Sequence, residues 1–318
     1  MNVKKTTTLP RVLMIGGPTA VGKSALAVQL AQAFHGEVIN GDAFQIYRGM
    51  DIGTAKVTAA EMAGVPHHLL DIVDPTEPYS AAQFKRDAKA AIAAVAARGH
   101  LPIVVGGTGF YLNALRLDLP LGGAAPPSPA RAALQQQLAA HDPEWLWQRL
   151  NAIDPASAAK IPAGNTRRVI RALEVWQETG QRVSGQPAPT PAYDALVIGL
   201  TTDRAVLYAR INARVDAMLT AGLVAEVQGL LQRVPASAQA LQAIGYKELV
   251  PYLQGDTDLA SAVALIKQHS RHYAKRQLTY FRHQLPTEWF DLVGDPAAIT
   301  QVQARVAAWL GENSELAR

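Results

Sequence analysis

The sequence predicts an α/β protein with a parallel sheet at its core, an inserted helical subdomain and a helical C-terminal part. Three observations support this fold class. Strand-like and helix-like segments alternate in the first third of the chain, two of the strand-like segments run directly into glycines, and two proline-rich segments flank a helical stretch. Alternation of this kind is typical of an open parallel sheet whose strands are connected by helices.

The regular elements follow from apolar runs and from the residues that end them. Short apolar runs next to glycine or polar residues predict strands, and these lie at residues 11–15, 37–40, 101–105 and 193–200. Longer segments rich in helix-forming residues predict helices, and these lie at about residues 23–34, 81–98, 204–232, 241–252 and 258–283. Gly99 follows the second of these helices and is a good C-terminal cap.

Proline-rich segments set the expected domain boundaries. Residues 119–129 contain four prolines and two glycines, and residues 184–191 contain three prolines. Such segments are typical of hinges, and the stretch between them, about residues 130–179, has helical character. We therefore expect a core in two parts, residues 1–118 and 193–318, with basic helices at its C-terminal end and a helical insertion at residues 119–192.

The overall composition excludes several kinds of site. The chain of 318 residues has no cysteine, which excludes disulfides, thiolate zinc sites and cysteine nucleophiles. Its formal net charge of +4 is compatible with an anionic partner without naming one. No signal peptide is expected from residues 1–15, and no apolar run is long enough to span a membrane, so we expect a cytoplasmic protein without membrane contact.

A glycine-rich motif follows the first predicted strand and matches the phosphate loop of P-loop NTPases, so the core is expected to be P-loop NTPase-like. Backbone N–H groups of such a loop point at phosphate oxygens, the lysine supplies a charge for the terminal phosphate, and the serine hydroxyl reaches Mg²⁺. The motif indicates a diphosphate or triphosphate ligand but not which one. Its residues are Gly17, Pro18, Thr19, Ala20, Val21, Gly22, Lys23 and Ser24.

The ends of the next two predicted strands carry the other candidate groups of this site. Chemistry in such sheets collects at the carboxyl ends of the strands, and Asp42 follows the second one. Asp42 is either a Mg²⁺ ligand, as in ordinary P-loop NTPases, or a general base. The third strand ends in glycines and Thr108 rather than in an acidic residue. This absence of an acid argues against an NTPase.

Two adjacent histidines, His67 and His68, invite a metal-site interpretation. Neighbouring side chains on a strand point to opposite faces, and no third ligand has suitable spacing. A structural role is therefore the better interpretation.

A basic stripe with interleaved aromatic residues is predicted on the last long helix. Lys267, Arg271 and Lys275 recur every four residues, Arg282 follows, and no acidic residue occurs between Lys267 and Glu288. Such a stripe indicates a surface for a nucleic-acid backbone, although it can also be an ordinary solvated face. A second cluster lies in the insertion, at Arg167, Arg168 and Arg171.

Taken together, several motifs resemble those of one family, the tRNA dimethylallyltransferases, also called tRNA isopentenyltransferases. The resemblance runs in order over nearly the whole chain, with Val21 and Ala43 as small departures. Ala43 stands where serine is usual, which removes one side chain that could contact RNA. Besides the phosphate loop, the matching segments are residues 42–47, 51–54, 67–72, 102–111, 171–175, 243–248 and 273–282.

The resemblance implies transfer of a dimethylallyl group from dimethylallyl diphosphate to N6 of the adenosine 3′ of the anticodon (position 37), in tRNAs that read codons beginning with U. It implies Mg²⁺ as cofactor, Asp42 as base, Lys23 and Arg214 as further catalytic residues, and a flipped target base near Thr108. We also expect a monomer. Contacts with the tRNA anticodon stem-loop are implied for Asp42, Ala43, Phe44, Gln45, Thr108, Arg167, Arg168, Val169, Ile170, Arg171, Gln242, Ala243, Ile244, Gly245, Tyr246, Lys247, Lys275, Arg276, Gln277, Leu278, Thr279, Tyr280, Phe281 and Arg282.

Three alternatives share parts of these features. An adenylate isopentenyltransferase, which prenylates free AMP, ADP or ATP, would have the same loop and base but would need neither the basic insertion nor the basic stripe. A small-molecule or RNA kinase and an RNA-binding switch NTPase would turn over nucleotides or bind them tightly. The identity of the prenyl acceptor therefore distinguishes the first alternative from a tRNA-modifying enzyme. Nucleotide turnover distinguishes the other two.

Overall fold

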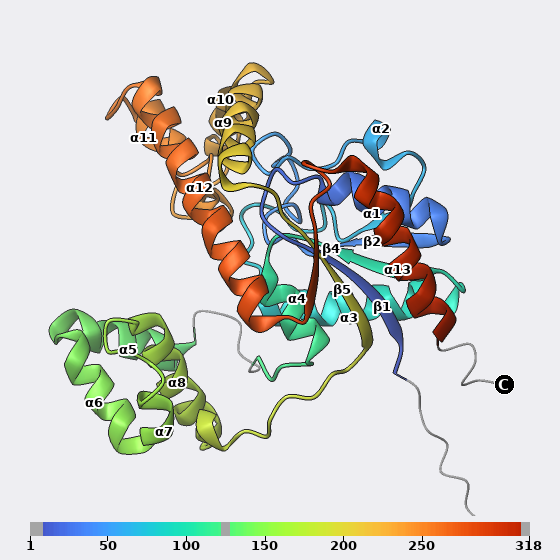
Figure 1. The fold of residues 1–318 in the computed structure, drawn as a ribbon. Coiled ribbons are helices and arrows are strands. Elements are labelled where there is room, and N and C mark those ends of the chain that lie inside the picture. Colours follow the sequence, from blue (N-terminus) through green and yellow to red (C-terminus); the bar gives the residue numbers. More distant parts are fainter. Residues whose placement is uncertain (1–8, 122–127, 313–318) are drawn as a thin grey trace, which may run out of the picture. The chain divides into compact units, whose positions relative to one another are not determined.

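The computed structural model describes residues 9–121 and 128–312, which form two compact units (Figure 1). One unit contains the described residues up to Leu119 and from Pro191 onward, and the other runs from Pro120 to Thr190. The backbone N–H of Ala192 donates to the carbonyl of Arg116 (2.8 Å), so the chain leaves and re-enters the first unit at neighbouring points. Six residues of the first proline-rich segment, 122–127, lie outside the described residues, and they include Gly122, Gly123, Pro126 and Pro127.

The first unit is built on a parallel six-stranded sheet with the order β3-β2-β4-β1-β5-β6. The predicted parallel sheet is thus confirmed, together with its four predicted strands. Sequence reasoning did not predict the edge strand β6, which is only four residues long and half-buried throughout. The strands are β1 (Arg11–Gly16), β2 (Gly36–Asn40), β3 (His67–His68), β4 (Leu101–Val105), β5 (Asp194–Leu200) and β6 (Thr287–Phe290).

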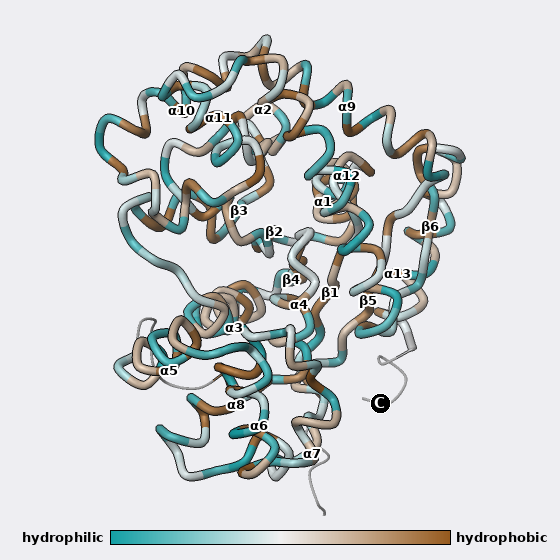
Figure 2. Tube along the Cα trace, turned by 90° about the vertical axis from the view of Figure 1, so that its left-hand side faces the viewer, coloured by the Kyte–Doolittle hydropathy of each residue, from teal (hydrophilic) through white to brown (hydrophobic). Residues whose placement is uncertain are grey.

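Helices cover both faces of this sheet because successive strand residues point to opposite sides. Val12 and Met14 of β1 belong to the core that includes α3 (Ala81–Ala97) and α4 (Gly109–Arg116). Leu13 and Ile15 belong to the core that includes α1 (Lys23–Ala33) and α13 (Ile299–Glu312). The strands accordingly show hydrophobic stretches in Figure 2. Burial on both faces fixes the loops at the carboxyl ends of β1, β2 and β4, which are adjacent strands.

The helices after β5 are more broken than the sequence predicts. The expected helix at 204–232 is two helices because Gly222, with φ +101°, separates them. The expected helix at 241–252 starts only after Gly245, with φ +98°. No helix in the described part of the chain is long and apolar enough to cross a membrane. The elements are α9 (Arg204–Thr220), α10 (Leu223–Leu231), η2 (Ala240–Gln242), α11 (Leu249–Gln254), α12 (Leu259–Gln284) and η3 (Pro296–Ala298), with α2 (Ala59–Met62) earlier in the chain.

The second unit has a hydrophobic core of its own. The helical stretch predicted here is four helices, each of the first three with a proline in its first turn. Figure 2 shows hydrophobic and hydrophilic residues alternating along these helices. Their inward side chains include Leu134, Leu146, Leu150 and Leu173, which are almost fully buried. The elements are α5 (Pro129–Ala140), α6 (Pro143–Ile153), α7 (Pro155–Ala158), α8 (Thr166–Thr179) and the short η1 (Val183–Gly185).

The paired histidines have a structural role. Nε2 of His68 contacts the carboxylate of Glu37 at 2.6 Å, and Arg98 and His100 bind the same carboxylate. Hydrogen bonds from these groups, that of Arg98 foremost, lower the pKa of the buried Glu37 carboxyl to about 2. His67 instead contacts the carbonyl of Val65. Through Glu37 this cluster joins β2 and β3 to the chain around β4.

Candidate active site

The phosphate loop lies between β1 and α1, as the motif predicts, and its backbone has the conformation that such a loop requires. Gly17 has φ +132°, and a Cβ there would lie 2.4 Å from the carbonyl oxygen of Leu200. Gly22, with φ +89°, stands at the N-cap of α1, where no side chain caps the helix. The first N–H groups of α1 and its dipole therefore form a site suited to an anion.

Gln277 of α12 fixes the phosphate loop from the other end of the chain. Its Oε1 accepts a hydrogen bond from the backbone N–H of Thr19 (3.1 Å), and its Nε2 donates to the carbonyl of Gly107 (2.9 Å). A Cβ at residue 107 would lie 2.2 Å from that nitrogen, so the glycine is needed for this close approach. The family resemblance implies a tRNA contact for Gln277. The structure buries the side chain, where it holds the loops after β1 and β4 together.

We expect the substitution Gln277→Leu to weaken donor binding. It removes two hydrogen bonds and leaves the part-buried N–H of Thr19 without this acceptor, so the KM for the diphosphate substrate should rise about 10-fold. Gln284→Leu is the matched control, because Gln284 is exposed at the end of the same helix. Steady-state kinetics with varied donor gives both values. Equal KM values for the two variants would contradict the role of Gln277.

Two cationic side chains and one carboxylate share the site. Nζ of Lys23 donates to the carbonyl of Pro18 (2.5 Å). Burial and the neighbouring Arg214 lower the pKa of Lys23 to about 7, against the opposing effect of Asp42. Burial also lowers the pKa of Arg214, and the carboxylates of Asp42 and Glu61 partly offset this. A bound diphosphate would stabilise this arrangement, in which the charge of Arg214 disfavours the charge of Lys23.

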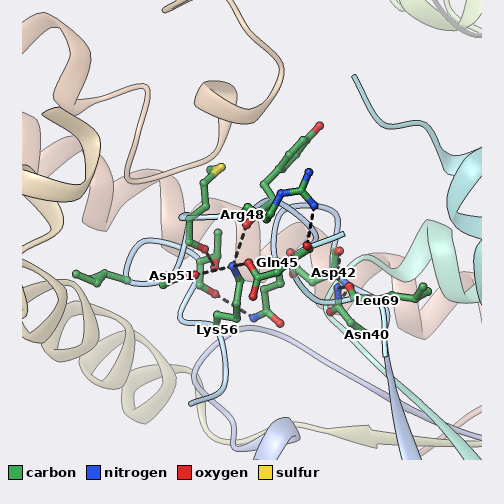
Figure 3. Close-up of polar contacts among 12 residues, drawn as sticks. Asn40, Asp42, Gln45, Arg48, Asp51, Lys56 and Leu69 are labelled. Carbon is green, nitrogen blue, oxygen red and sulfur yellow. Dashed lines mark hydrogen bonds and ion pairs between the residues drawn. The ribbon is translucent and has the colours of Figure 1, made fainter. Parts of the chain in front are cut away.

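Asp42 is held by the turn that follows β2 (Figure 3). Its backbone N–H donates to Oδ1 of Asn40 (3.0 Å), and the amide of Asn40 donates to the carbonyl of Leu69 (3.0 Å). Oδ1 of Asp42 accepts from the N–H of Phe44 (2.9 Å). The other carboxylate oxygen accepts no hydrogen bond within the described part of the chain. One oxygen is thus anchored and the other can accept a proton from a substrate.

Thr108 joins the loop after β4 to the loop after β2. Its Oγ1 accepts from the backbone N–H of Ala43 (3.2 Å), and Tyr273 of α12 forms side-chain hydrogen bonds with Thr108 and Gln277. Burial, followed by the charge of Asp42, raises the pKa of Tyr273 to about 12, so this hydroxyl stays protonated at neutral pH. The structure therefore brings together Lys23, Asp42 and Thr108 from three strand ends, as their positions predict.

The oxygen donors suit a Mg²⁺ ion that a phosphate carries rather than one that the protein cages. Ser24 lies in the first turn of α1 beside Lys23, and Asp42 is the carboxylate whose charge acts on Lys23. The described residues contain no group of three His, Cys, Asp or Glu side chains that could bind a metal. Mg²⁺ commonly keeps several waters and uses one or two side chains together with substrate phosphates.

The basic stripe of α12 is less free than the sequence suggests. Lys267 forms an ion pair with Asp216 of α9 (2.6 Å), and Arg271 donates to Asn212 of the same helix (2.7 Å). The carboxylate that neutralises Lys267 thus comes from a neighbouring helix, and the sequence of α12 alone could not reveal it. Further along, Lys275 and Arg276 are exposed and form no ion pair with a carboxylate in the described parts of the chain. The guanidinium of Arg282 lies over the ring of Trp289.

Several residues in the segments expected to contact tRNA belong instead to the hydrophobic cores. Phe281, for example, packs against Gly16, where a Cβ would lie 2.2 Å from its ring. Arg171 is committed to the buried Glu174 and to the carbonyl of Leu121, whereas Arg167 and Arg168 are exposed. Within these segments, only the exposed residues are accessible to RNA. The side chains that burial removes from this role are Val169, Ile170, Ala243, Tyr246, Gln277 and Phe281.

The parallel sheet, the phosphate loop and the aspartate at the next strand end define a P-loop protein that acts on a phosphorylated substrate. A family model described as IPP transferase matches residues 45–284, and one described as isopentenyl transferase matches residues 10–76. The chain is 66% identical over 300 residues to the tRNA dimethylallyltransferase of Lacticaseibacillus paracasei, which covers 94% of this chain and 97% of the relative. The chain belongs to the IPP transferase family.

Solved structures agree with this assignment. The full-length tRNA isopentenylpyrophosphate transferase of Bacillus halodurans superimposes with a TM-score of 0.74 and 45% identity, over 96% of this chain and 98% of that chain. A eukaryotic dimethylallyltransferase acting on tRNA gives a TM-score of 0.83 and 31% identity, over 95% of this chain and 80% of that one. The fold and its helical insertion are therefore features that the family shares along nearly the whole length of this chain.

Proposed function

We propose that the protein transfers the dimethylallyl group of dimethylallyl diphosphate to N6 of the adenosine 3′ of the anticodon, position 37, in tRNAs that read codons beginning with U. The product is N6-(dimethylallyl)adenosine. The observation that carries this proposal is the meeting of the phosphate loop with Asp42 and Thr108 at adjoining strand ends. Relatives that match along most of the chain are named as tRNA dimethylallyltransferases, which supports tRNA as the acceptor.

The chemistry follows from the placement of the charges. The exocyclic amine is a weak nucleophile, so Asp42 accepts its proton while the bond from N6 to the allylic carbon forms. At the same carbon the bond to the diphosphate oxygen breaks, and the diphosphate leaves with the electron pair. Lys23, Arg214 and the loop N–H groups stabilise this departing charge. Mg²⁺ bound through Ser24 and the diphosphate would supply further charge neutralisation.

A nucleic-acid acceptor explains two groups of exposed cationic side chains that a free nucleotide would not require. Lys275 and Arg276 are exposed on α12, and Arg167 and Arg168 are exposed in the second unit. The phosphates of a single nucleotide are too few to need four exposed cations on two helices, whereas a stem-loop carries many phosphates. We therefore place the enzyme in the cytoplasm, where tRNA is, and expect a monomer to suffice because one chain supplies every group of the site.

The deciding experiment is incubation with labelled dimethylallyl diphosphate and either an anticodon stem-loop or AMP. We expect label in the stem-loop at its adenosine 3′ of the anticodon and little in AMP. Comparable labelling of AMP would favour an adenylate isopentenyltransferase. Release of phosphate from ATP in a parallel incubation to which ATP is added would favour a kinase or an NTPase.

Substitution of the exposed cations of α12 should lower both tRNA affinity and its salt dependence. Each phosphate contact releases counterions, so replacing Lys275 and Arg276 with alanine should reduce the slope of log K against log salt by about one to two units. Lys267→Ala is the control on the same helix, because Asp216 already neutralises that ammonium. Binding of a stem-loop across a salt series gives the slopes. Equal slopes for the wild type and the double variant would contradict a phosphate-contacting surface.

A further inference from the structure

A single carboxylate on α10 binds three consecutive backbone N–H groups of the loop after β2. Glu226 accepts hydrogen bonds from Asp51 (2.9 Å), Ile52 (2.8 Å) and Gly53 (3.0 Å). Successive N–H groups that point at one spot form an anion-binding nest. Here the protein's own carboxylate, about 175 residues further along the chain, occupies the nest.

A fourth donor to the same carboxylate is a tyrosine hydroxyl. The hydroxyl of the buried Tyr246 donates to Oε1 of Glu226 (2.5 Å). Burial, followed by the charge of Glu226, raises the pKa of Tyr246, so the hydroxyl remains a donor. The ring of Tyr246 covers Gly53 so closely that a Cβ there would lie 2.3 Å from it. The loop is thus fixed by packing as well as by hydrogen bonds.

Lys56 fixes the same loop from within (Figure 3). Its side chain is only 6% exposed, and its ammonium contacts the carboxylates of Asp51 (2.6 Å) and Asp71 (2.5 Å) and the carbonyl of Tyr47 (2.8 Å). Asp51 is therefore held twice, through its backbone N–H by Glu226 and through its carboxylate by Lys56.

The loop held in this way orients Gln45, the third residue after Asp42. Nε2 of Gln45 donates to the carbonyls of Thr54 (3.1 Å) and Ala55 (3.3 Å), which directly follow the three residues bound by Glu226. Carbonyl groups only accept hydrogen bonds, so the nitrogen of the amide must face them. Oε1 of Gln45 accepts no hydrogen bond from any described residue, and it remains available to a donor on a bound base.

We propose that Glu226 is a positioning residue for the acceptor RNA, which acts by fixing residues 51–55 so that their carbonyls orient the amide of Gln45. The inference rests on the proposed function, because it assigns Glu226 to the RNA side of the reaction and not to the donor side. Glu226 touches neither the phosphate loop nor Asp42 through any hydrogen bond of the described residues. Its loss should therefore separate the two substrates kinetically.

The test is Glu226→Gln, which keeps the shape of the side chain but places an NH₂ group against backbone N–H donors. We expect the KM for the anticodon stem-loop to rise about 10-fold, with the KM for dimethylallyl diphosphate within about 2-fold of wild type. Glu288→Gln is the matched control, because Glu288 lies on β6 and its carboxylate pairs with Arg305 of α13, outside this loop. Tyr246→Phe keeps the ring over Gly53 and removes one donor. It should give a smaller change of the same kind even if Glu226→Gln folds poorly.

A double-mutant cycle shows whether Glu226 acts through Gln45. If it does, Glu226→Gln should add little to the KM change caused by Gln45→Ala. Fully additive changes, equal changes in both KM values, or an unchanged stem-loop KM in a folded Glu226→Gln protein would each overturn the inference. Wild-type turnover of the stem-loop, measured in parallel, separates these outcomes from a failure of the proposed function, in which the wild type itself would not label RNA.

Discussion

Lys23→Ala should lower turnover by two orders of magnitude or more, a loss of about 3 kcal/mol of transition-state stabilisation. The ammonium is anchored by the carbonyl of Pro18 and lies in the field of Arg214 and Asp42, where a departing diphosphate would gain negative charge. The affinity for tRNA should barely change, because no exposed RNA-facing group is lost. Single-turnover kinetics gives the rate, and stem-loop binding without donor gives the affinity. An equal loss of RNA binding would contradict the assignment to the diphosphate.

The lowered pKa of Lys23 gives this prediction a pH dependence with a definite sign. A pKa of about 7 means that the free enzyme loses the Lys23 charge as pH rises above that value. Donor binding needs the charge, so kcat/KM for dimethylallyl diphosphate should fall above about pH 7, by up to 10-fold per pH unit. In Lys23→Arg the guanidinium stays charged, so its profile, at whatever overall rate, should lack this decline. A decline of the same size in Lys23→Arg would assign it to another group.

Asp42→Asn should slow the bond-forming step by about 10²- to 10⁴-fold while both substrates still bind. Asparagine can keep the hydrogen bond from the N–H of Phe44 through its oxygen, so the turn after β2 should survive. What is lost is the oxygen that can accept the proton of the adenine amine. Rapid-quench measurement of product on preformed complexes isolates this step.

A magnesium titration distinguishes the two possible roles of Asp42. If Asp42 were chiefly a metal ligand, the variant would need more Mg²⁺ and excess Mg²⁺ would restore the rate. If Asp42 is the base, the rate should remain low at saturating Mg²⁺.

The central strands could be predicted from the sequence, whereas one edge strand and two helix breaks could not. The apolar runs at 11–15 and 101–105 became central strands because such runs suit burial on both faces of a parallel sheet. The short strand β6 carries no such run, since its four residues are only half-buried at the sheet edge. The helix breaks at Gly222 and Gly245 were missed because glycine within a helical pattern does not by itself show that φ is positive.

Some residues of the candidate site could likewise be placed from the sequence, and others could not. Lys23 and Asp42 could be placed together from sequence because both follow strands, and strand ends meet at one edge of a parallel sheet. Gln277 and Glu226 could not be placed, since their partners lie about 258 and 175 residues away and their own neighbours resemble ordinary helix surface. The matching family motif did include Gln277, but a motif cannot tell a buried support from a residue that touches RNA.

The hydrogen bond between Ala192 and Arg116 has a consequence for chain entropy. The hydrogen bond brings together the two ends of the insertion. For the entropy of the first unit, the roughly 70 intervening residues therefore act as one closed loop. Loop-closure entropy grows only with the logarithm of length, so this excursion costs the core about 2–3 kcal/mol more than a turn of about four residues. The hydrophobic core of the second unit offsets much of this cost, because its packed helices shorten the effective length of the loop. An insertion of this size can therefore change in length or sequence with little effect on the stability of the sheet.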